Sequence, residues 1–186
     1  MIEITNVSKS FGGDSVLTGF NLSVKKGERV CLMGRSGCGK STVLNLLLGF
    51  IPADSGTVLC DSPVSAVFQE DRLCEDFSAL SNVKMVLPKG EEEKAIRLLE
   101  ELSLGEDLHR PVRDFSGGMK RRVAIARALA AEYEVLLLDE AFTGLDELSR
   151  KTTADCINRH SVGKTILMVS HDKEDAELLG AQIISV

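Results

Sequence analysis

The sequence predicts an α/β fold in which a mostly parallel core sheet follows an antiparallel N-terminal portion. Two continuous apolar runs, Val135–Leu138 and Thr165–Val169, are typical of strands that helices bury on both faces. The N-terminal part instead alternates short apolar runs with glycine turns, which indicates antiparallel strands. The 186 residues, 44% hydrophobic and 27% charged, are enough for one buried core and too apolar for a disordered chain.

Seven strands are expected, each identified by a short apolar run. Turn signals at Gly12-Gly13 and Lys26-Gly27 separate the first three runs. The later runs are continuous rather than alternating, as expected for strands inside a covered sheet. In order, the strands are Ile2–Val7, Val16–Val24, Arg29–Met33, Val64–Phe68, Val135–Leu138, Thr165–Val169 and Gln182–Val186.

Four helices are expected between these strands. Gly49 ends the first, and Ile96 and Leu99 belong to an apolar set that recurs at helical spacing in the second. Ser116 is a suitable N-cap for the third, and the fourth fills the crossover between two parallel strands. In order, the helices are Lys40–Leu48, Glu91–Leu102, the segment that follows Ser116, and Asp146–Arg159.

Charge and cysteine content argue against several classes of protein. The chain has 22 basic and 28 acidic residues, a net charge of −6 that disfavours unspecific nucleic-acid binding. No apolar run reaches the roughly 18 residues of a membrane helix, and no secretory signal pattern opens the chain. The five cysteines are scattered without a Cys-x-x-Cys pair, which argues against a disulfide framework or a structural zinc site. We therefore expect a cytoplasmic protein with reduced thiols.

A glycine-rich loop after the third strand matches the pattern G-x-x-x-x-G-K-[ST]. Its glycines let backbone N–H groups turn toward an anion, and the following helix N-terminus adds partial positive charge. Lys40 is expected to contact the β- and γ-phosphates, and Ser41 to hold Mg²⁺. The pattern predicts a P-loop NTPase, the alternative being a glycine-rich turn with an incidental Lys-Ser pair. The expected ATP-binding residues are Gly34, Arg35, Ser36, Gly37, Cys38, Gly39, Lys40, Ser41 and Thr42.

Two carboxylates end the apolar run Val135–Leu138. Ligands bind at the carboxyl ends of parallel strands, so Asp139 is expected to hold Mg²⁺ and Glu140 to act as a general base on water. A buried acidic pair without a cation would be costly, which supports a metal. The alternative is that Asp139 is only a helix N-cap.

A second glycine motif precedes the third helix. Ser116 is the expected cap, and Gly117 and Gly118 leave the first N–H groups open to an anion. Two glycines are poor helix formers, so a requirement other than helix propensity places them there, although a plain cap is the alternative. The basic triplet Lys120–Arg122 that follows is expected to be a solvated face.

Together these motifs resemble those of the ATP-binding subunits of ABC transporters. Gly34–Thr42 resembles their Walker A loop, and Val135–Glu140 resembles Walker B with its catalytic glutamate. Phe115–Met119 resembles the family signature, with Met119 where glutamine is usual. The resemblance covers essentially the whole chain and keeps the family's order of motifs.

Further positions extend the resemblance. Gln69 resembles the Q-loop glutamine, and His171 resembles the switch histidine. Thr143–Asp146 resembles the D-loop, and Phe11 lies where the family often places an aromatic ring against adenine. The stretch Gln69–Leu73 resembles, more weakly, importers of the nitrate, sulfonate and taurine type.

The resemblance implies an ATPase that uses ATP and Mg²⁺. It assigns catalytic roles to Glu140, His171, Lys40 and Gln69. It assigns Mg²⁺ coordination to Ser41, Gln69 and Asp139. In a head-to-tail dimer, the ATP of the partner subunit would be contacted by Ser116, Gly117 and Gly118.

The resemblance also implies the organisation and the partners. Residues 1–186 would form one ABC-type ATP-binding domain, with a helical subdomain at roughly 71–130 between the Q-loop and Walker B. The partners would be a second ATP-binding subunit, identical or paralogous, membrane-spanning permease subunits and a solute-binding protein, with no nucleic acid. The protein would lie at the inner face of the plasma membrane. Apolar residues in the segment Asp71–Val86 suggest a docking surface, with a subdomain core helix as the alternative.

A non-transport or regulatory ABC ATPase with little turnover is the alternative function. Met119 and the chain end at Val186, where the family usually continues, favour it, whereas Glu140 and His171 oppose it. DNA-repair types carry a long coiled coil or a zinc insert, and translation-factor types carry two ATPase units. The sequence shows none of these features.

Overall fold

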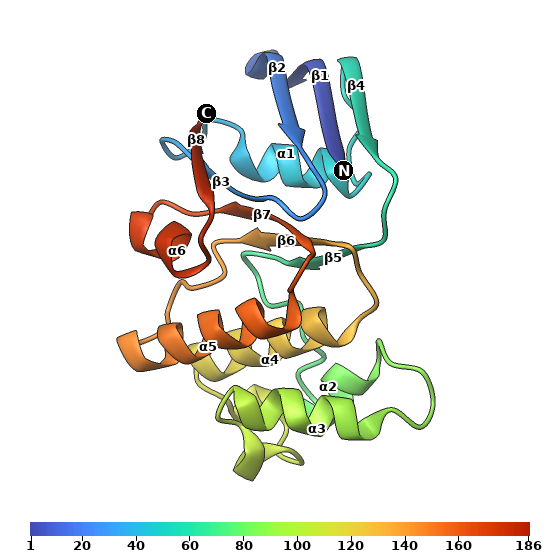
Figure 1. The fold of residues 1–186 in the computed structure, drawn as a ribbon, viewed down its shortest axis with the longest axis vertical. Coiled ribbons are helices and arrows are strands. Elements are labelled where there is room, and N and C mark those ends of the chain that lie inside the picture. The colour runs from blue at the N-terminus through green and yellow to red at the C-terminus, as the bar shows by residue number, and fades with distance from the viewer.

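Two sheets of different kinds organise the chain in the computed structural model, which describes residues 1–186 (Figure 1). An antiparallel sheet has the order β2-β1-β4, and a parallel sheet has the order β5-β6-β7-β3-β8. The antiparallel strands are β1 (Ile2–Phe11), β2 (Asp14–Val24) and β4 (Ser55–Cys60). The parallel strands are β5 (Val64–Val67), β6 (Val135–Asp139), β7 (Thr165–Val169), β3 (Arg29–Met33) and β8 (Gln182–Ser185).

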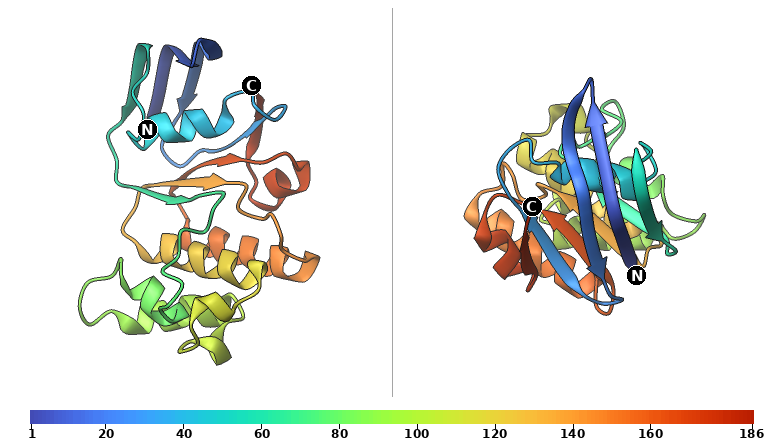
Figure 2. Two further views of the ribbon diagram at one scale, coloured as in Figure 1. Left: turned by 180° about the vertical axis from the view of Figure 1, so that it is seen from behind. Right: turned by 90° about the horizontal axis from the view of Figure 1, so that it is seen from above.

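The helices form layers on both sides of the parallel sheet. Helix α1 (Lys40–Leu47) lies between the two sheets, and α4 (Gly117–Ala130) and α5 (Glu147–His160) cover the opposite face (Figure 1). Helices α2 (Ala79–Lys84) and α3 (Glu92–Glu101) form a further layer beyond α4, as the view from behind in Figure 2 also shows. Helix α6 (Lys173–Leu178) and two short 3₁₀ helices, Gly105–Asp107 and Val112–Asp114, complete the fold.

The core follows this layering because β6 and β7 are buried along their whole length. Alternate residues of β6 face opposite sides: Leu137 packs with α1 and the antiparallel sheet, while Leu136 and Leu138 pack with α4 and α5. Burial on both faces explains the continuous apolar runs and confirms the expected α/β fold. None of the helices has the length and apolar composition needed to cross a membrane.

Two elements, β4 and α6, were not expected from the sequence, and α2 was expected only as the alternative interpretation of the segment Asp71–Val86. Strand β4 pairs with β1 at the edge of its sheet and is mostly exposed, and its apolar run is limited to Val58–Cys60. Helix α6 has six residues and is too short to show helical periodicity by itself. Strands β1 and β2 are also longer than expected, because backbone pairing continues to Phe11 and Asp14 at the glycine turn, where the side chains are exposed.

Candidate functional site

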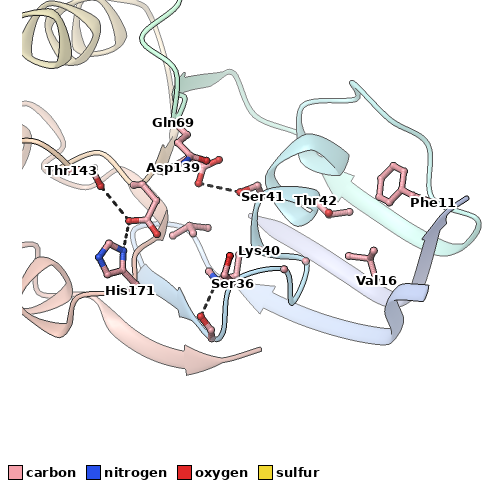
Figure 3. A pocket seen from close by; sticks show the side chains of 15 residues that line it. Phe11, Val16, Ser36, Lys40, Ser41, Thr42, Gln69, Asp139, Thr143 and His171 are labelled. Carbon is pink, nitrogen blue, oxygen red and sulfur yellow. Dashed lines mark hydrogen bonds and ion pairs between the residues drawn. The ribbon is translucent and has the colours of Figure 1, made fainter. Parts of the chain in front are cut away.

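A cavity of about 510 Å³ lies where the carboxyl ends of the parallel strands meet the N-terminus of α1 (Figure 3). Strands β3, β5, β6 and β7 all end there, as expected for ligand sites of parallel sheets. The cavity brings together the glycine loop Gly34–Thr42 and the acidic pair Asp139-Glu140. Its lining residues are Phe11, Val16, Gly34, Ser36, Gly37, Gly39, Lys40, Ser41, Thr42, Gln69, Asp139, Glu140, Thr143, Val169 and His171.

The glycine loop has a backbone that side chains would disturb. Gly37 and Gly39 have φ values of +83° and +97°, which favour glycine. A Cβ at Gly39 would lie 2.7 Å from a Leu17 methyl carbon, and one at Gly34 would lie 2.6 Å from a backbone oxygen. No side chain caps α1, so the N–H groups of its first turn remain available to an anion.

Lys40 supplies a full positive charge beside these N–H groups. Its Nζ donates hydrogen bonds of 2.9 Å to the carbonyl oxygens of Gly34 and Arg35. These contacts fold the side chain back over its own loop, where an ammonium group faces the cavity (Figure 3). The loop therefore combines a fixed array of N–H donors with a cation, the chemistry that phosphate groups require.

Asp139 and Ser41 form an oxygen-rich corner of the cavity. The Ser41 hydroxyl is 3.3 Å from Asp139 Oδ1, and the Asp139 side chain is buried. Burial, and to a lesser degree the neighbouring Glu140, raises the pKa of Asp139. A buried carboxylate beside a hydroxyl and the Gln69 side chain fits a hard divalent cation such as Mg²⁺, which prefers oxygen ligands.

Glu140 is turned into the cavity by an unusual backbone. Its φ is +50°, sparsely populated for a non-glycine residue, and its N–H donates to the Val169 carbonyl at 3.0 Å. Its Oε2 atom lies 2.8 Å from His171 Nδ1 and 3.5 Å from Thr143 Oγ1. The carboxylate is thus oriented by neighbours on both sides, as a base that must hold a water molecule requires.

Phe11 and Val16 lie at the opposite end of the cavity from His171 and Thr143, with Lys40 and Ser41 between them (Figure 3). Phe11 is 47% exposed, so its ring is accessible for stacking. The ammonium of Lys9 lies 5.4 Å from its centroid. None of the sequence motifs predicted that Val16, near the start of β2, would line the cavity.

The basic triplet Lys120–Arg122 is not the solvated face expected from the sequence. Arg121 is buried, and its guanidinium donates hydrogen bonds of 2.5 Å to the carbonyls of Phe68 and Gln69. It also lies 3.2 Å from Asp71 Oδ1. Successive helix residues are turned by about 100°, so three in a row cannot all face solvent on a helix packed between two layers.

The signature residues lie outside this cavity. Ser116 caps α4, with its Oγ accepting a hydrogen bond from the Met119 N–H at 3.3 Å, as expected. Nothing lies within 4 Å of a Cβ built at Gly117. A Cβ at Gly118 would lie 3.2 Å from the Gly144 carbonyl, so this glycine permits close approach of the D-loop-like turn. The start of α4 is therefore an open N-terminus beside, but not within, the cavity of its own chain.

The expected docking segment Asp71–Val86 is partly buried in the core, as a core helix would be, and partly exposed, as a docking surface would be. Leu80 and Val83 are buried in the core, so these residues are not available to a partner. Phe77 and Met85 are instead half exposed, at 50% and 48%. Helical spacing could not separate the two sets, because it identifies a face without saying what covers it.

Comparisons with a family model and with individual relatives both identify similarity to transport proteins. A family model described as ABC transporter matches residues 17–143. The chain is 38% identical to the aliphatic sulfonates import ATP-binding protein SsuB 3 of Rhodococcus jostii, over 98% of this chain and 70% of that protein. It is 36% identical to the nitrate transport protein NasD of Klebsiella oxytoca, over 99% of this chain and 79% of that protein.

Solved structures show the same similarity at the level of the backbone. A dimeric ATP-binding cassette in a post-hydrolysis state, bound to ADP and Pi, superposes with a TM-score of 0.90 at 29% identity. The match covers 100% of this chain and 94% of that one. The mixed α/β architecture is therefore that of the P-loop cassettes expected from the sequence.

Proposed function

The chain belongs to the ABC transporter family, and from this premise we propose that it is the ATP-binding and ATP-hydrolysing subunit of an importer. The main support is the cavity itself, in which the Lys40 loop, the Asp139–Ser41 corner and the Glu140–His171 pair converge. The sulfonate and nitrate import proteins that resemble the chain support the direction of transport.

The cavity suits a nucleoside triphosphate from end to end. Phe11 would stack on the base, while the glycine loop and Lys40 would hold the phosphates. Ser41, Asp139 and Gln69 would hold Mg²⁺, which supplies charge neutralisation at the β- and γ-phosphates. The remaining loop residues, Gly34 to Thr42, would contribute mainly backbone N–H groups.

Hydrolysis would be carried out by the residues at the other end of the cavity. Glu140 accepts a proton from the attacking water, and its strained backbone and the His171 contact fix the carboxylate in position. Lys40 stabilises the negative charge on the γ-phosphoryl oxygens and on the ADP leaving group as the bond between the β- and γ-phosphates breaks. His171, exposed on its other side, is placed to contact the γ-phosphate.

A second subunit would complete the site. Ser116, Gly117 and Gly118 lie outside the cavity of their own chain, and the N–H groups of Gly117 and Gly118, unlike that of Met119, are not used by the Ser116 cap and can meet an anion. In a head-to-tail dimer, identical or paralogous, they would contact the γ-phosphate bound to the partner. ATP then joins the two subunits, and hydrolysis weakens the contact by separating ADP from phosphate.

The wider assembly follows from the same proposal. Residues 1–186 would act as one domain, with a helical subdomain at roughly 71–130 that carries the exposed Phe77 and Met85. This surface would contact permease subunits at the inner face of the membrane, and a solute-binding protein would deliver the solute from the other side. We expect no nucleic-acid partner, because the net charge of −6 disfavours unspecific binding.

The variant Glu140→Gln tests the proposal because it keeps the shape of the side chain and removes the base. We expect ATP binding to persist, phosphate release to fall by ~100-fold or more, and an ATP-dependent dimer to become detectable by size-exclusion chromatography with light scattering. Near-normal phosphate release would contradict the role of Glu140. Negligible release by the unaltered chain, even with its permease present, would favour a regulatory ATPase.

A further inference from the structure

Three side chains with different ligand atoms converge at the ends of two helices, outside the ATP cavity. Glu101 is the last residue of α3, and Cys156 and His160 lie one turn apart on α5, which His160 ends. Their ligand oxygen, sulfur and nitrogen atoms all lie within 4.8 Å of one another. His160 Nε2 is 3.0 Å from Glu101 Oε2. Nothing in the proposed ATPase mechanism uses this Glu101–Cys156–His160 cluster.

We propose that the Glu101–Cys156–His160 cluster binds a zinc ion that links the outer helix α3 to α5. Zinc accepts sulfur, nitrogen and oxygen ligands together, at about 2.0–2.3 Å in a tetrahedral arrangement. Ligand atoms in such a site are roughly 3.3–3.8 Å apart, so the present separations, all within 4.8 Å, are close to those that a zinc ion requires. Glu101 and His160 are 27% and 32% exposed, which lets water occupy the fourth position.

The electrostatic surroundings favour a cation in this cluster. The last residues of α3 and α5 meet here, and the C-terminal ends of helices carry partial negative charge. Burial, followed by the neighbouring Glu101 carboxylate, raises the pKa of Cys156 to about 12, so deprotonation of the thiol is a cost that zinc binding must offset. Zinc binding replaces that proton: the S–H bond breaks, the sulfur–zinc bond forms and the proton leaves to solvent.

One nearby cation competes with zinc. The Arg159 guanidinium lies 3.3 Å from Glu101 Oε2, but its side chain is 60% exposed. It can therefore turn toward solvent when the metal binds, at the small cost of an exposed ion pair. The absence of a Cys-x-x-Cys pair argued against zinc at the level of the sequence. A search for Cys-x-x-Cys pairs does not find this cluster, because the cluster has a single thiol, Cys156, and Glu101 comes from another helix.

Cobalt titration of the full, reduced and metal-stripped chain tests the proposal, without nucleotide or Mg²⁺. Cobalt replaces zinc and reports a thiolate ligand through a sulfur-to-metal charge-transfer band. We expect that band, with one cobalt per chain, and its loss when zinc is added. A hundredfold excess of zinc over its dissociation constant should raise Tm by roughly 5–10 °C.

Single variants identify the ligands. Cys156→Ser should abolish the band, and the surface changes Glu101→Gln and His160→Gln should weaken cobalt binding by ~10-fold or more. Cys74→Ser and His109→Gln, at exposed positions away from the cluster, are matched controls and should bind like the unaltered chain. If circular dichroism shows that Cys156→Ser does not fold, cobalt binding by Glu101→Gln and His160→Gln tests the proposed ligands instead. No band, or a band that survives all three ligand variants, would show that Glu101 and His160 form an ordinary ion pair beside a buried thiol.

Discussion

Replacing Arg121 with methionine should destabilise the protein far more than a change at a surface arginine. The Arg121 side chain is 7% exposed and its guanidinium contacts two backbone carbonyls and the Asp71 carboxylate. Methionine fills similar volume but donates no hydrogen bond, so two carbonyls and a mostly buried carboxylate lose their partner. Burial already raises the pKa of Asp71 while Arg121 lowers it, so the two groups depend on each other.

The magnitude follows from those contacts. Breaking a buried ion pair by removing one partner costs about 3–5 kcal/mol. Asp71 is 22% exposed, so solvent relieves part of the loss and the lower end, about 3 kcal/mol, is the better expectation. For a chain of this length, that corresponds to a Tm lower by roughly 6–12 °C.

Urea unfolding and calorimetry of Arg121→Met measure this cost directly. Arg113→Met is the matched control, because Arg113 pairs with Asp76 at 2.8 Å but both side chains are more than half exposed. That control should change the free energy of unfolding by about 1 kcal/mol or less. In an Asp71→Asn background the cost of Arg121→Met should shrink, since no charge is left unpaired. A loss for Arg121→Met no larger than that of Arg113→Met would refute the reasoning.

Three other changes act within the cavity. Lys40→Ala should abolish nucleotide binding, because it removes the only full charge of the loop that reaches the phosphates; an unchanged dissociation constant by titration calorimetry would contradict the phosphate-loop assignment. Phe11→Ala should raise the KM for ATP by roughly 5–150-fold, the equivalent of ~1–3 kcal/mol of stacking, without abolishing turnover in a phosphate-release assay. Asp139→Asn should weaken Mg²⁺-dependent ATP binding while leaving the Tm of the nucleotide-free chain equal or higher, because burial disfavours the carboxylate; a large fall in Tm would show a structural role instead.

The sequence predicted the glycine loop and the acidic pair because their chemistry is local. Gly39 has a φ of +97°, a conformation that favours glycine at this position of the loop. Asp139 and Glu140 come at the end of a strand whose continuous apolar composition indicates that it is buried. Thr143 and Val16 were not identified as cavity residues. Their place depends on how the chain turns after β6 and on which part of β2 faces α1, and tertiary packing sets both.

Arg121 shows a different reason for failure. The charge of the triplet Lys120–Arg122, taken alone, predicts that all three side chains face solvent. On α4, which has α2 and α3 on one side and the parallel sheet on the other, the same run must place one residue inward. The geometry of the helix was available from the sequence, but the two layers that enclose it were not.

The position of Arg121 also bears on how the two glycine motifs communicate. Helix α4 begins at the signature, which would meet the partner's ATP, and Arg121 in its second turn holds the carbonyl of Gln69, which lines the ATP cavity of its own chain. Spatial connection alone does not demonstrate coupling. If α4 transmits a signal, Arg121→Met should weaken ATP binding as well as stability, although Arg121 does not line the cavity. If stability alone falls, the two motifs act independently and Arg121 serves only the packing of the helical layers.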